Sequence, residues 1–204
     1  LPGVEVAIGH EEELLVRGVG LMQGYWDNPE AARAAIDADG WLHTGDQARI
    51  EDGRIYITGR IKDILVLSNG EKVPPGDMES AIALDPLFEQ VLVIGEGQAF
   101  LCALLVLNPE EWRALAASLE VDPEAEDSLH QKHTHAALLS RVGGRLRDFP
   151  GYAKVRRIYP TLEPWTVDQG LMTPTMKIKR ARVLSHYAEQ IDRMYNEERL
   201  RRAG

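Results

Sequence analysis

Hydrophobic and polar positions alternate over short segments in the first sixty residues. This pattern predicts strands, and a helix is predicted after Asn28, a good cap residue, with Pro29 in the first helical position. Asp52-Gly53 suits the tight turn of a hairpin. The predicted strands are residues 4–8, 14–16, 47–50 and 54–58, and the predicted helix covers 31–36. These sixty residues are too few to form a hydrophobic core of their own. We therefore expect residues 1–60 to be a β-rich strip of a larger domain.

The pattern changes after residue 60, where continuous apolar runs alternate with segments of helical periodicity. Strands are expected at 64–67, 91–94, 101–107 and 155–159, and helices at 75–82, 109–119, 136–146 and 181–201. Residues 120–135 are polar and expected to be exposed. Asn69-Gly70 predicts a two-residue hairpin turn with positive φ at both positions. We therefore predict an α+β fold for residues 61–204, with a three- to four-stranded sheet and flanking helices.

Charge is distributed unevenly along the chain. The net charge is −9, yet residues 150–204 hold 11 Lys and Arg against 6 Asp and Glu. An acidic chain with a basic tail argues against nucleic acid as the main partner. The tail could contact phosphates or an anionic membrane surface, or simply form a solvated helix.

The cysteine content and the start of the chain indicate where in the cell the protein is found. Cys102 is the single cysteine and lies in an apolar run, so we expect a buried side chain and a cytoplasmic protein. The absence of an apolar run of eighteen residues predicts no spanning helix, which leaves at most peripheral contact with the inner face of the membrane. The chain starts without Met and without a signal peptide, so we expect it to be a piece of a longer protein.

Two charged segments near the middle of the chain could carry chemistry. Asp46 follows Thr44-Gly45, and a carboxylate after such a turn can accept two hydrogen bonds from a ribose diol; an ordinary turn aspartate is an equal alternative. Arg60 offers a forked donor for ribose oxygens or phosphate. Lys62-Asp63 lies where the two patterns meet and could be a hinge or a solvated turn.

A third segment, residues 173–180, places Lys177 in a loop before a predicted helix. An ammonium projected into a cleft would neutralise an anionic transition state. The alternative, a basic helix start, is unfavourable because helix N-termini carry positive potential. The histidines at 130, 133 and 135 lie in a polar stretch without cysteine, and we assign no metal site.

Together these segments resemble the adenylate-forming superfamily, which includes acyl-CoA synthetases, luciferase and peptide-synthetase adenylation domains. The similarity lies in four strings that occur in the family's order: Gly24–Glu30 (GYxxxPE), Trp41–Asp46 (WxxTGD), Gly59–Asp63 (GRxKD) and Lys177–Arg180 (GKIxR), the last with Met176 in place of glycine. Residues 64–75 and 173–177 are most similar to long-chain fatty acid–CoA ligases.

The resemblance implies a two-step reaction with ATP, Mg²⁺, a fatty acid and CoA. A carboxylate first attacks the α-phosphate of ATP and releases pyrophosphate; the CoA thiol then attacks the acyl carbon and releases AMP. By this resemblance Asp46 and Arg60 would hold the ribose. Lys177 would bind ATP and bridge the attacking carboxylate and the α-phosphate as the catalytic residue.

The resemblance also implies a mobile C-terminal domain. Lys62 and Asp63 would form its hinge, with a boundary near residues 60–63. Rotation would withdraw the adenylation lysine and present a CoA-binding loop of Asn69, Gly70 and Glu71, in which glycine lets the pantetheine arm pass close to the backbone.

Two other interpretations stay open. The chain could be an adenylation domain that passes its acyl group to a carrier protein, or a non-catalytic module that kept the fold. In every case we expect the isolated chain to be inactive, because the family's phosphate-binding loop, adenine pocket and acyl tunnel lie upstream of these residues. Acyl chain length and oligomeric state are not predicted.

Overall fold

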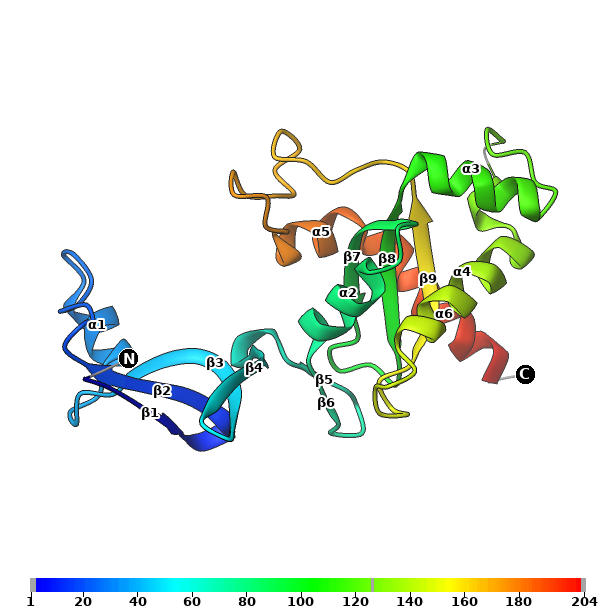
Figure 1. Cartoon of the computed structure of the whole chain (residues 1–204). Helices are drawn as coiled ribbons and strands as arrows, with labels where there is room; N and C mark the ends of the chain where they lie inside the picture. Colours follow the sequence, from blue (N-terminus) through cyan, green and yellow to red (C-terminus); the bar gives the residue numbers. More distant parts are fainter. Residues whose placement is uncertain (1–2, 126, 203–204) are drawn as a thin grey trace. The chain divides into compact units, whose positions relative to one another are not determined.

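A computed structural model describes residues 3–125 and 127–202, with side chains through residue 196. The backbone divides into two compact units, Leu1–Ile64 and Leu65–Gly204, which are described separately (Figure 1). Helices and strands are both abundant, and the strands form small sheets with helices beside them. This arrangement confirms the predicted mixed fold class. In the part of the chain that is described, no helix is both long and apolar enough to cross a membrane.

The first unit is built on a four-stranded antiparallel sheet in the order β1-β2-β3-β4. Its elements are β1 (Val4–Ile8), η1 (His10–Glu12), β2 (Glu13–Gly18), α1 (Pro29–Ala35), β3 (Leu42–Glu51), β4 (Arg54–Arg60) and η2 (Ile61–Asp63). The Asn28 side chain accepts from the Ala31 amide and caps α1 as predicted. Asp52 and Gly53 both have positive φ in the β3–β4 hairpin, which confirms that turn.

The first unit also corrects one expectation. The sequence suggested a turn at Thr44-Gly45 with Asp46 behind it, whereas β3 runs through all three residues. The strand is irregular here: Gly45 has φ +70°, and the register between β2 and β3 shifts beside it. An irregular strand of this kind redirects side chains locally, so Asp46 is presented by a distorted strand.

The second unit combines a three-stranded sheet, ordered β7-β8-β9, with the small β5–β6 hairpin. Its elements are β5 (Leu65–Val66), β6 (Lys72–Val73), α2 (Pro75–Ala83), β7 (Phe88–Ile94), β8 (Leu101–Leu107), α3 (Pro109–Ser118), η3 (Ser128–His130), α4 (Lys132–Arg145), β9 (Val155–Thr161), α5 (Arg180–His186) and α6 (Ala188–Arg202). β8 is antiparallel to β7 and parallel to β9. All of its seven residues are buried, which explains the continuous apolar run.

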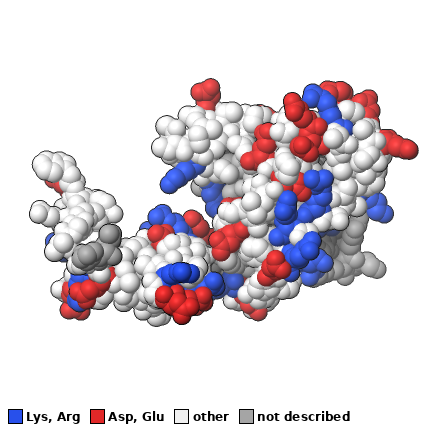
Figure 2. Space-filling view, in the orientation of Figure 1, with Lys and Arg blue, Asp and Glu red and all other residues white. Residues whose placement is uncertain are grey.

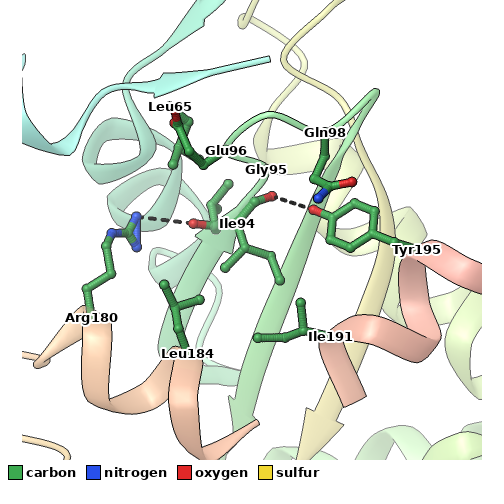
Figure 3. Close-up of a pocket in the computed structure, with 10 residues that line it drawn as sticks. Leu65, Ile94, Gly95, Glu96, Gln98, Arg180, Leu184, Ile191 and Tyr195 are labelled. Carbon is green, nitrogen blue, oxygen red and sulfur yellow. Dashed lines mark hydrogen bonds between the residues drawn. The ribbon is translucent and has the colours of Figure 1, made fainter. Parts of the chain in front are cut away.

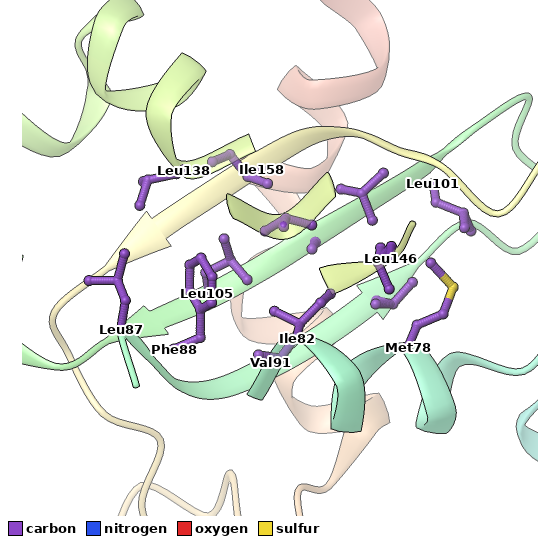
Figure 4. Close-up of a cluster of buried hydrophobic side chains, with 14 of the residues drawn as sticks. Met78, Ile82, Leu87, Phe88, Val91, Leu101, Leu105, Leu138, Leu146 and Ile158 are labelled. Carbon is purple, nitrogen blue, oxygen red and sulfur yellow. The ribbon is translucent and has the colours of Figure 1, made fainter. Parts of the chain in front are cut away.

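The three-stranded sheet is covered on both faces. One face packs against α2, α3 and α4 in the cluster that includes Met78, Ile82, Leu105, Leu138 and Ile158 (Figure 4). The other face packs against α5, α6 and the loop after β9, through side chains that include Leu104, Trp165, Val183, Tyr187 and Tyr195. Cys102 is fully buried on this second face, as its apolar neighbourhood predicted.

Three expectations for the second unit were wrong in detail. The apolar run 64–67 forms a strand of only two residues, and Val66 is 38% exposed, because β5 pairs only with the equally short β6 and lies outside the main sheet. The polar stretch 120–135 includes Ser128 and Thr134, both buried and joined by a hydrogen bond from the Thr134 hydroxyl to the Ser128 carbonyl, and α4 begins at Lys132.

The C-terminal helix is the third correction. The predicted helix at 181–201 is two helices, α5 and α6, separated at Tyr187. The Tyr187 ring is buried and its hydroxyl accepts a hydrogen bond from the Trp165 indole at 3.2 Å. The break therefore occurs at the residue that packs against the loop after β9.

Candidate active site

The structure brings Asp46 and Arg60 together in the first unit. They are direct partners in the β3–β4 register, and the Arg60 Nε donates to Asp46 Oδ1 at 2.7 Å. The side chains of Asp46 and Arg60 are 29% and 65% exposed. A carboxylate held by a guanidinium and open to solvent can accept hydrogen bonds from the hydroxyls of a sugar.

Glu13 organises the strand segment before Asp46. Its two carboxylate oxygens bond the His43 Nδ1 at 2.7 Å and the Gly45 amide at 2.9 Å. The hydrogen bond to Glu13, together with the negative charges of Glu13 and Asp37, raises the pKa of His43 above its usual value despite partial burial. Glu13 was missed by the sequence analysis, because it lies 32 positions before Gly45 and the contact is made across the sheet.

Lys62 and Asp63 lie in the short 3-10 helix η2, directly after β4. Both side chains are exposed, and the division between the two units falls after Ile64. The expected hinge residues thus lie in a short 3-10 helix just before this division.

Asn69, Gly70 and Glu71 lie on the loop that joins β5 and β6. The Gly70 amide donates to the Leu67 carbonyl at 2.8 Å, and the Leu67 amide donates to the Glu71 carbonyl at 2.9 Å. This pattern belongs to a three-residue hairpin loop whose last residue is left-handed. Gly70 has φ +87° whereas Asn69 has negative φ, so the predicted two-residue turn with two left-handed positions was wrong.

Lys177 lies on a second hairpin loop, which is enclosed by the isolated bridge between Met172 and Ile178. The Met176 amide donates to the Thr173 carbonyl at 2.8 Å, and the Thr173 amide donates to the Lys177 carbonyl at 2.8 Å. This is the same pattern as in the β5–β6 loop. Here the left-handed position, φ +60°, is held by Met176, the residue that replaces the family's glycine.

Side chains reinforce the second loop. Thr173 Oγ1 accepts from the Lys177 amide at 3.0 Å and lies 3.0 Å from the Thr175 hydroxyl. Pro174 occupies the second turn position, where its fixed φ is favourable. The Lys177 side chain is exposed, and within the described part of the chain no carboxylate pairs with it. Its ammonium is therefore free to meet an anion.

The segment that carries Lys177 is attached to β7. Gln90 exchanges two hydrogen bonds with the Trp165 backbone, accepting from the amide at 2.7 Å and donating to the carbonyl at 3.0 Å. Arg180 is attached near the other end of β7, beside a pocket of about 180 Å³ (Figure 3). The pocket is lined mainly by apolar side chains, among them Leu65, Ile94, Leu184 and Ile191, with Tyr195 donating to the Ile94 carbonyl.

Charges of both signs lie on the face of the second unit that is in view. Figure 2 shows acidic and basic side chains interspersed, with a group of Lys and Arg over α4, which holds Arg141 and Arg145. Within the described residues, no group of three His, Cys, Asp or Glu side chains is arranged to hold a metal ion.

A family model matches this chain over most of its length. The model of the AMP-binding enzyme C-terminal domain covers residues 62–199, and so includes both hairpin loops. The chain belongs to this family. Membership confirms the resemblance to adenylate-forming enzymes.

Relatives that match in sequence include two ligases. The chain is 35% identical over 210 residues to the long-chain-fatty-acid–CoA ligase FadD15 of Mycobacterium tuberculosis, covering 97% of this chain and 33% of the relative. It is 36% identical over 202 residues to the chloroplastic long-chain-fatty-acid–[acyl-carrier-protein] ligase AEE15 of Arabidopsis thaliana, covering 92% of this chain and 26% of the relative. The chain thus spans a third or less of these relatives.

Solved structures agree on the fold. The adenylation–carrier didomain of the carboxylic acid reductase from Segniliparus rugosus, in complex with AMP, superposes with a TM-score of 0.78 at 26% identity. The match covers 94% of this chain and 26% of that one. The two units described here therefore correspond to a part of a much longer adenylate-forming protein.

Proposed function

We propose that this chain is the C-terminal part of a long-chain fatty acid–CoA ligase that forms acyl-AMP and then the CoA thioester. The proposal rests on family membership and on the identity to fatty acid ligases. The whole reaction also needs the remaining two thirds of such a polypeptide. ATP, a fatty acid and CoA are its substrates, and Mg²⁺ would arrive with the ATP phosphates.

Lys177 carries the proposal. Its exposed ammonium has no carboxylate partner among the described residues, and it projects from a short turn closed by several hydrogen bonds. In adenylation the carboxylate oxygen bonds to the α-phosphorus, the bond to pyrophosphate breaks, and negative charge builds up between them. A fixed ammonium between the two groups stabilises that charge.

Asp46 and Arg60 supply the nucleotide-binding part of the proposal. Arg60 holds one oxygen of the Asp46 carboxylate, and the distorted strand at Gly45 leaves that carboxylate partly exposed. In the proposed complex Asp46 accepts hydrogen bonds from the ribose hydroxyls, and Arg60 fixes its orientation and adds donors to the nucleotide.

The β5–β6 loop supplies the thioester step. A Cβ added at Gly70 would meet nothing within 4 Å, so the backbone there is open on one side. The proposed CoA arm passes along that open backbone beside Asn69 and Glu71, after rotation about Lys62 and Asp63 replaces the Lys177 loop by this one. Two loops on one unit thereby serve two successive steps.

The first unit has apolar surface that supports its assignment to a larger domain. Val4, Val6 and Ile8 alternate along β1 and are 37–40% exposed, and the loop residues Val19 and Trp26 are almost fully exposed. This apolar surface is a candidate interface. We assign it to contact with the rest of the large domain, in line with the length of the relatives.

The test uses the full-length polypeptide and two separate assays. Lys177→Ala should lower acyl-dependent pyrophosphate release with palmitate and ATP at least about a hundredfold, and should leave thioester formation from pre-made palmitoyl-AMP nearly unchanged. Lys179→Ala removes a second exposed lysine from the same segment and is the matched control. No loss of adenylation in Lys177→Ala would refute the proposed function, as would equal losses in the two lysine variants.

A carrier protein is the second candidate acceptor. The 36% identity to an acyl-carrier-protein ligase favours it as much as the identity to FadD15 favours CoA. The two acceptors are separated by giving the full-length enzyme, loaded with acyl-AMP, either free CoA or a phosphopantetheinylated carrier protein. The isolated chain should show no synthetase activity, and acyl-CoA formation by the purified chain would contradict that expectation.

A further inference from the structure

Glu79 and Arg180 bind the backbone of β7 at the free edge of the three-stranded sheet. β7 is an edge strand, and the amide and carbonyl of Val93 point away from β8 toward these two side chains. The Val93 amide donates to Glu79 Oε1 at 2.8 Å, and Arg180 Nη2 donates to the Val93 carbonyl at 3.1 Å. Two side chains therefore replace the backbone of a further strand at this position.

The same two residues are an ion pair. Both terminal nitrogens of Arg180 donate to Glu79 Oε1, at 2.9 and 2.8 Å. The side chains of Arg180 and Glu79 are only 25% and 21% exposed, so solvent screens the pair less than it screens a surface pair. Glu79 comes from α2 and Arg180 from the first position of α5, 101 residues later.

The ion pair lies at one end of the segment that carries Lys177. Arg180 is three residues after Lys177, and the Lys179 amide donates to the Leu171 carbonyl at 2.8 Å, at the base of the Lys177 loop. The Gln90 contacts with Trp165 hold the other end of the same segment. Lys177 therefore projects from a segment fixed to β7 on both sides.

We propose that Glu79 is a positioning residue for Lys177, acting through Arg180. Glu79 does not touch the substrates; it fixes the guanidinium, which fixes the end of the loop and with it the direction of the ammonium. The inference rests on the proposed function of Lys177. A displacement of about 1 Å in a group that must bridge two reactants is enough to lower a rate roughly a hundredfold.

The experiment compares two carboxylate-to-amide changes, one on α2 and one in the turn after it, in the full-length polypeptide. Glu79→Gln weakens the contact to Arg180. Asp85→Asn weakens a second part-buried ion pair near this helix, in which Arg141 binds Asp85 at 2.6 and 2.9 Å, far in sequence from the Lys177 segment. Unfolding temperature, both half-reactions and amide hydrogen exchange over residues 171–179 are measured for each variant.

Glu79→Gln should lower the kcat of adenylation roughly tenfold or more, with little change in the KM for ATP and less than about a twofold change in thioester formation from pre-made acyl-AMP. Exchange over 171–179 should become faster in Glu79→Gln and not in Asp85→Asn. In a Lys177→Ala background, Glu79→Gln should cause no further loss of adenylation, because both changes act through one group.

Unchanged adenylation in Glu79→Gln, or an equal loss in both half-reactions, would overturn the positioning role. So would the same loss of adenylation in Asp85→Asn. If Lys177→Ala itself left adenylation unchanged, the proposed function would fall instead. Failure of the inference alone is recognised by an inactive Lys177→Ala enzyme beside a fully active Glu79→Gln enzyme.

Discussion

The two hairpin loops of the second unit have the same hydrogen-bond pattern and different residues at the decisive position. Each loop places its last residue in the left-handed region, where glycine is unstrained and other residues cost about 1 kcal/mol or more. The β5–β6 loop uses Gly70 there and the Lys177 loop uses Met176. The two loops therefore share a backbone shape. The loop with Gly70 at the left-handed position exposes its backbone, whereas the loop with Met176 there presents the side chain of Lys177.

The compensation in the Lys177 loop is visible in its contacts. Pro174 fixes one turn position, and Thr173 binds the Lys177 amide through its hydroxyl. In the glycine loop the Asn69 side chain adds a comparable contact, accepting from the Glu71 amide at 3.2 Å. We infer that the extra contacts offset the strain at Met176, and substitutions in the two loops can separate these contributions.

The largest effect on stability is expected at the glycine. Gly70→Val should lower the free energy of unfolding by about 2 kcal/mol, because a β-branched residue is strained at φ +87°. Met176→Val should cost less than half as much, because the native residue already carries most of that strain. Urea titrations followed by the fluorescence of the buried Trp112 and Trp165 measure both changes. Equal losses of unfolding free energy in Gly70→Val and Met176→Val would contradict the proposed difference in strain between the two loops.

The second effect has the opposite sign. Met176→Gly should raise the free energy of unfolding by up to about 1 kcal/mol, since it removes left-handed strain and the Met176 side chain is 66% exposed. The gain is reduced by the greater freedom of glycine in the unfolded chain. A loss of stability in the same titration would mean that Met176 makes a contribution that its exposure does not reveal.

A smaller effect is expected from the loop side chains. Thr173→Val removes the acceptor for the Lys177 amide and should cost about 0.5–1 kcal/mol. Asn69→Ala should cost less than Thr173→Val, because the Asn69 hydrogen bond is longer, at 3.2 Å against 3.0 Å. Amide exchange at Lys177 and Glu71 reports each loop separately. Faster exchange at Glu71 in Thr173→Val would contradict the independence of the loops.

The smallest effect is a pH dependence of stability at Asp85, a buried residue in the turn after α2. Burial, the largest single cause, would raise the pKa of Asp85, but the hydrogen bonds from Arg141 and the Leu87 amide, together with the charges of Arg141 and Arg145, lower that pKa. A lowered pKa in the folded state gives stability that is present above the unfolded value of about 3.9 and is lost as the pH falls through the folded value. The stability gap between the parent and Asp85→Asn should therefore narrow below about pH 4, and a constant gap would contradict the assignment.

Local sequence signals predicted most elements because they depend on near neighbours. The strands β7 and β8, the cap at Asn28 and the Asp52-Gly53 turn result from apolar runs and turn residues. The position of the Asn69-Gly70 loop was also predicted, but its type was not, since the closing pair Leu67–Glu71 selects a three-residue loop.

Contacts across the fold could not be predicted in this way. Glu79 pairs with a residue 101 positions away, and no pattern in α2 separates it from the other acidic residues of the chain. The helix break at Tyr187 depends on its contact with Trp165, 22 residues earlier, which no local signal reveals. Met176 was predicted in part. Its position was marked because it replaces the glycine of the family string, but its left-handed conformation is known only from the structure.

The most direct test of a division of labour between the two loops is the ratio of the two half-reaction rates in two variants of the full-length enzyme, Lys177→Ala and Gly70→Val. We predict opposite changes: Lys177→Ala loses adenylation and keeps thioester formation, whereas Gly70→Val keeps adenylation and loses thioester formation. A ratio that stays at the parent value in both variants would contradict the division of the two steps between the two loops.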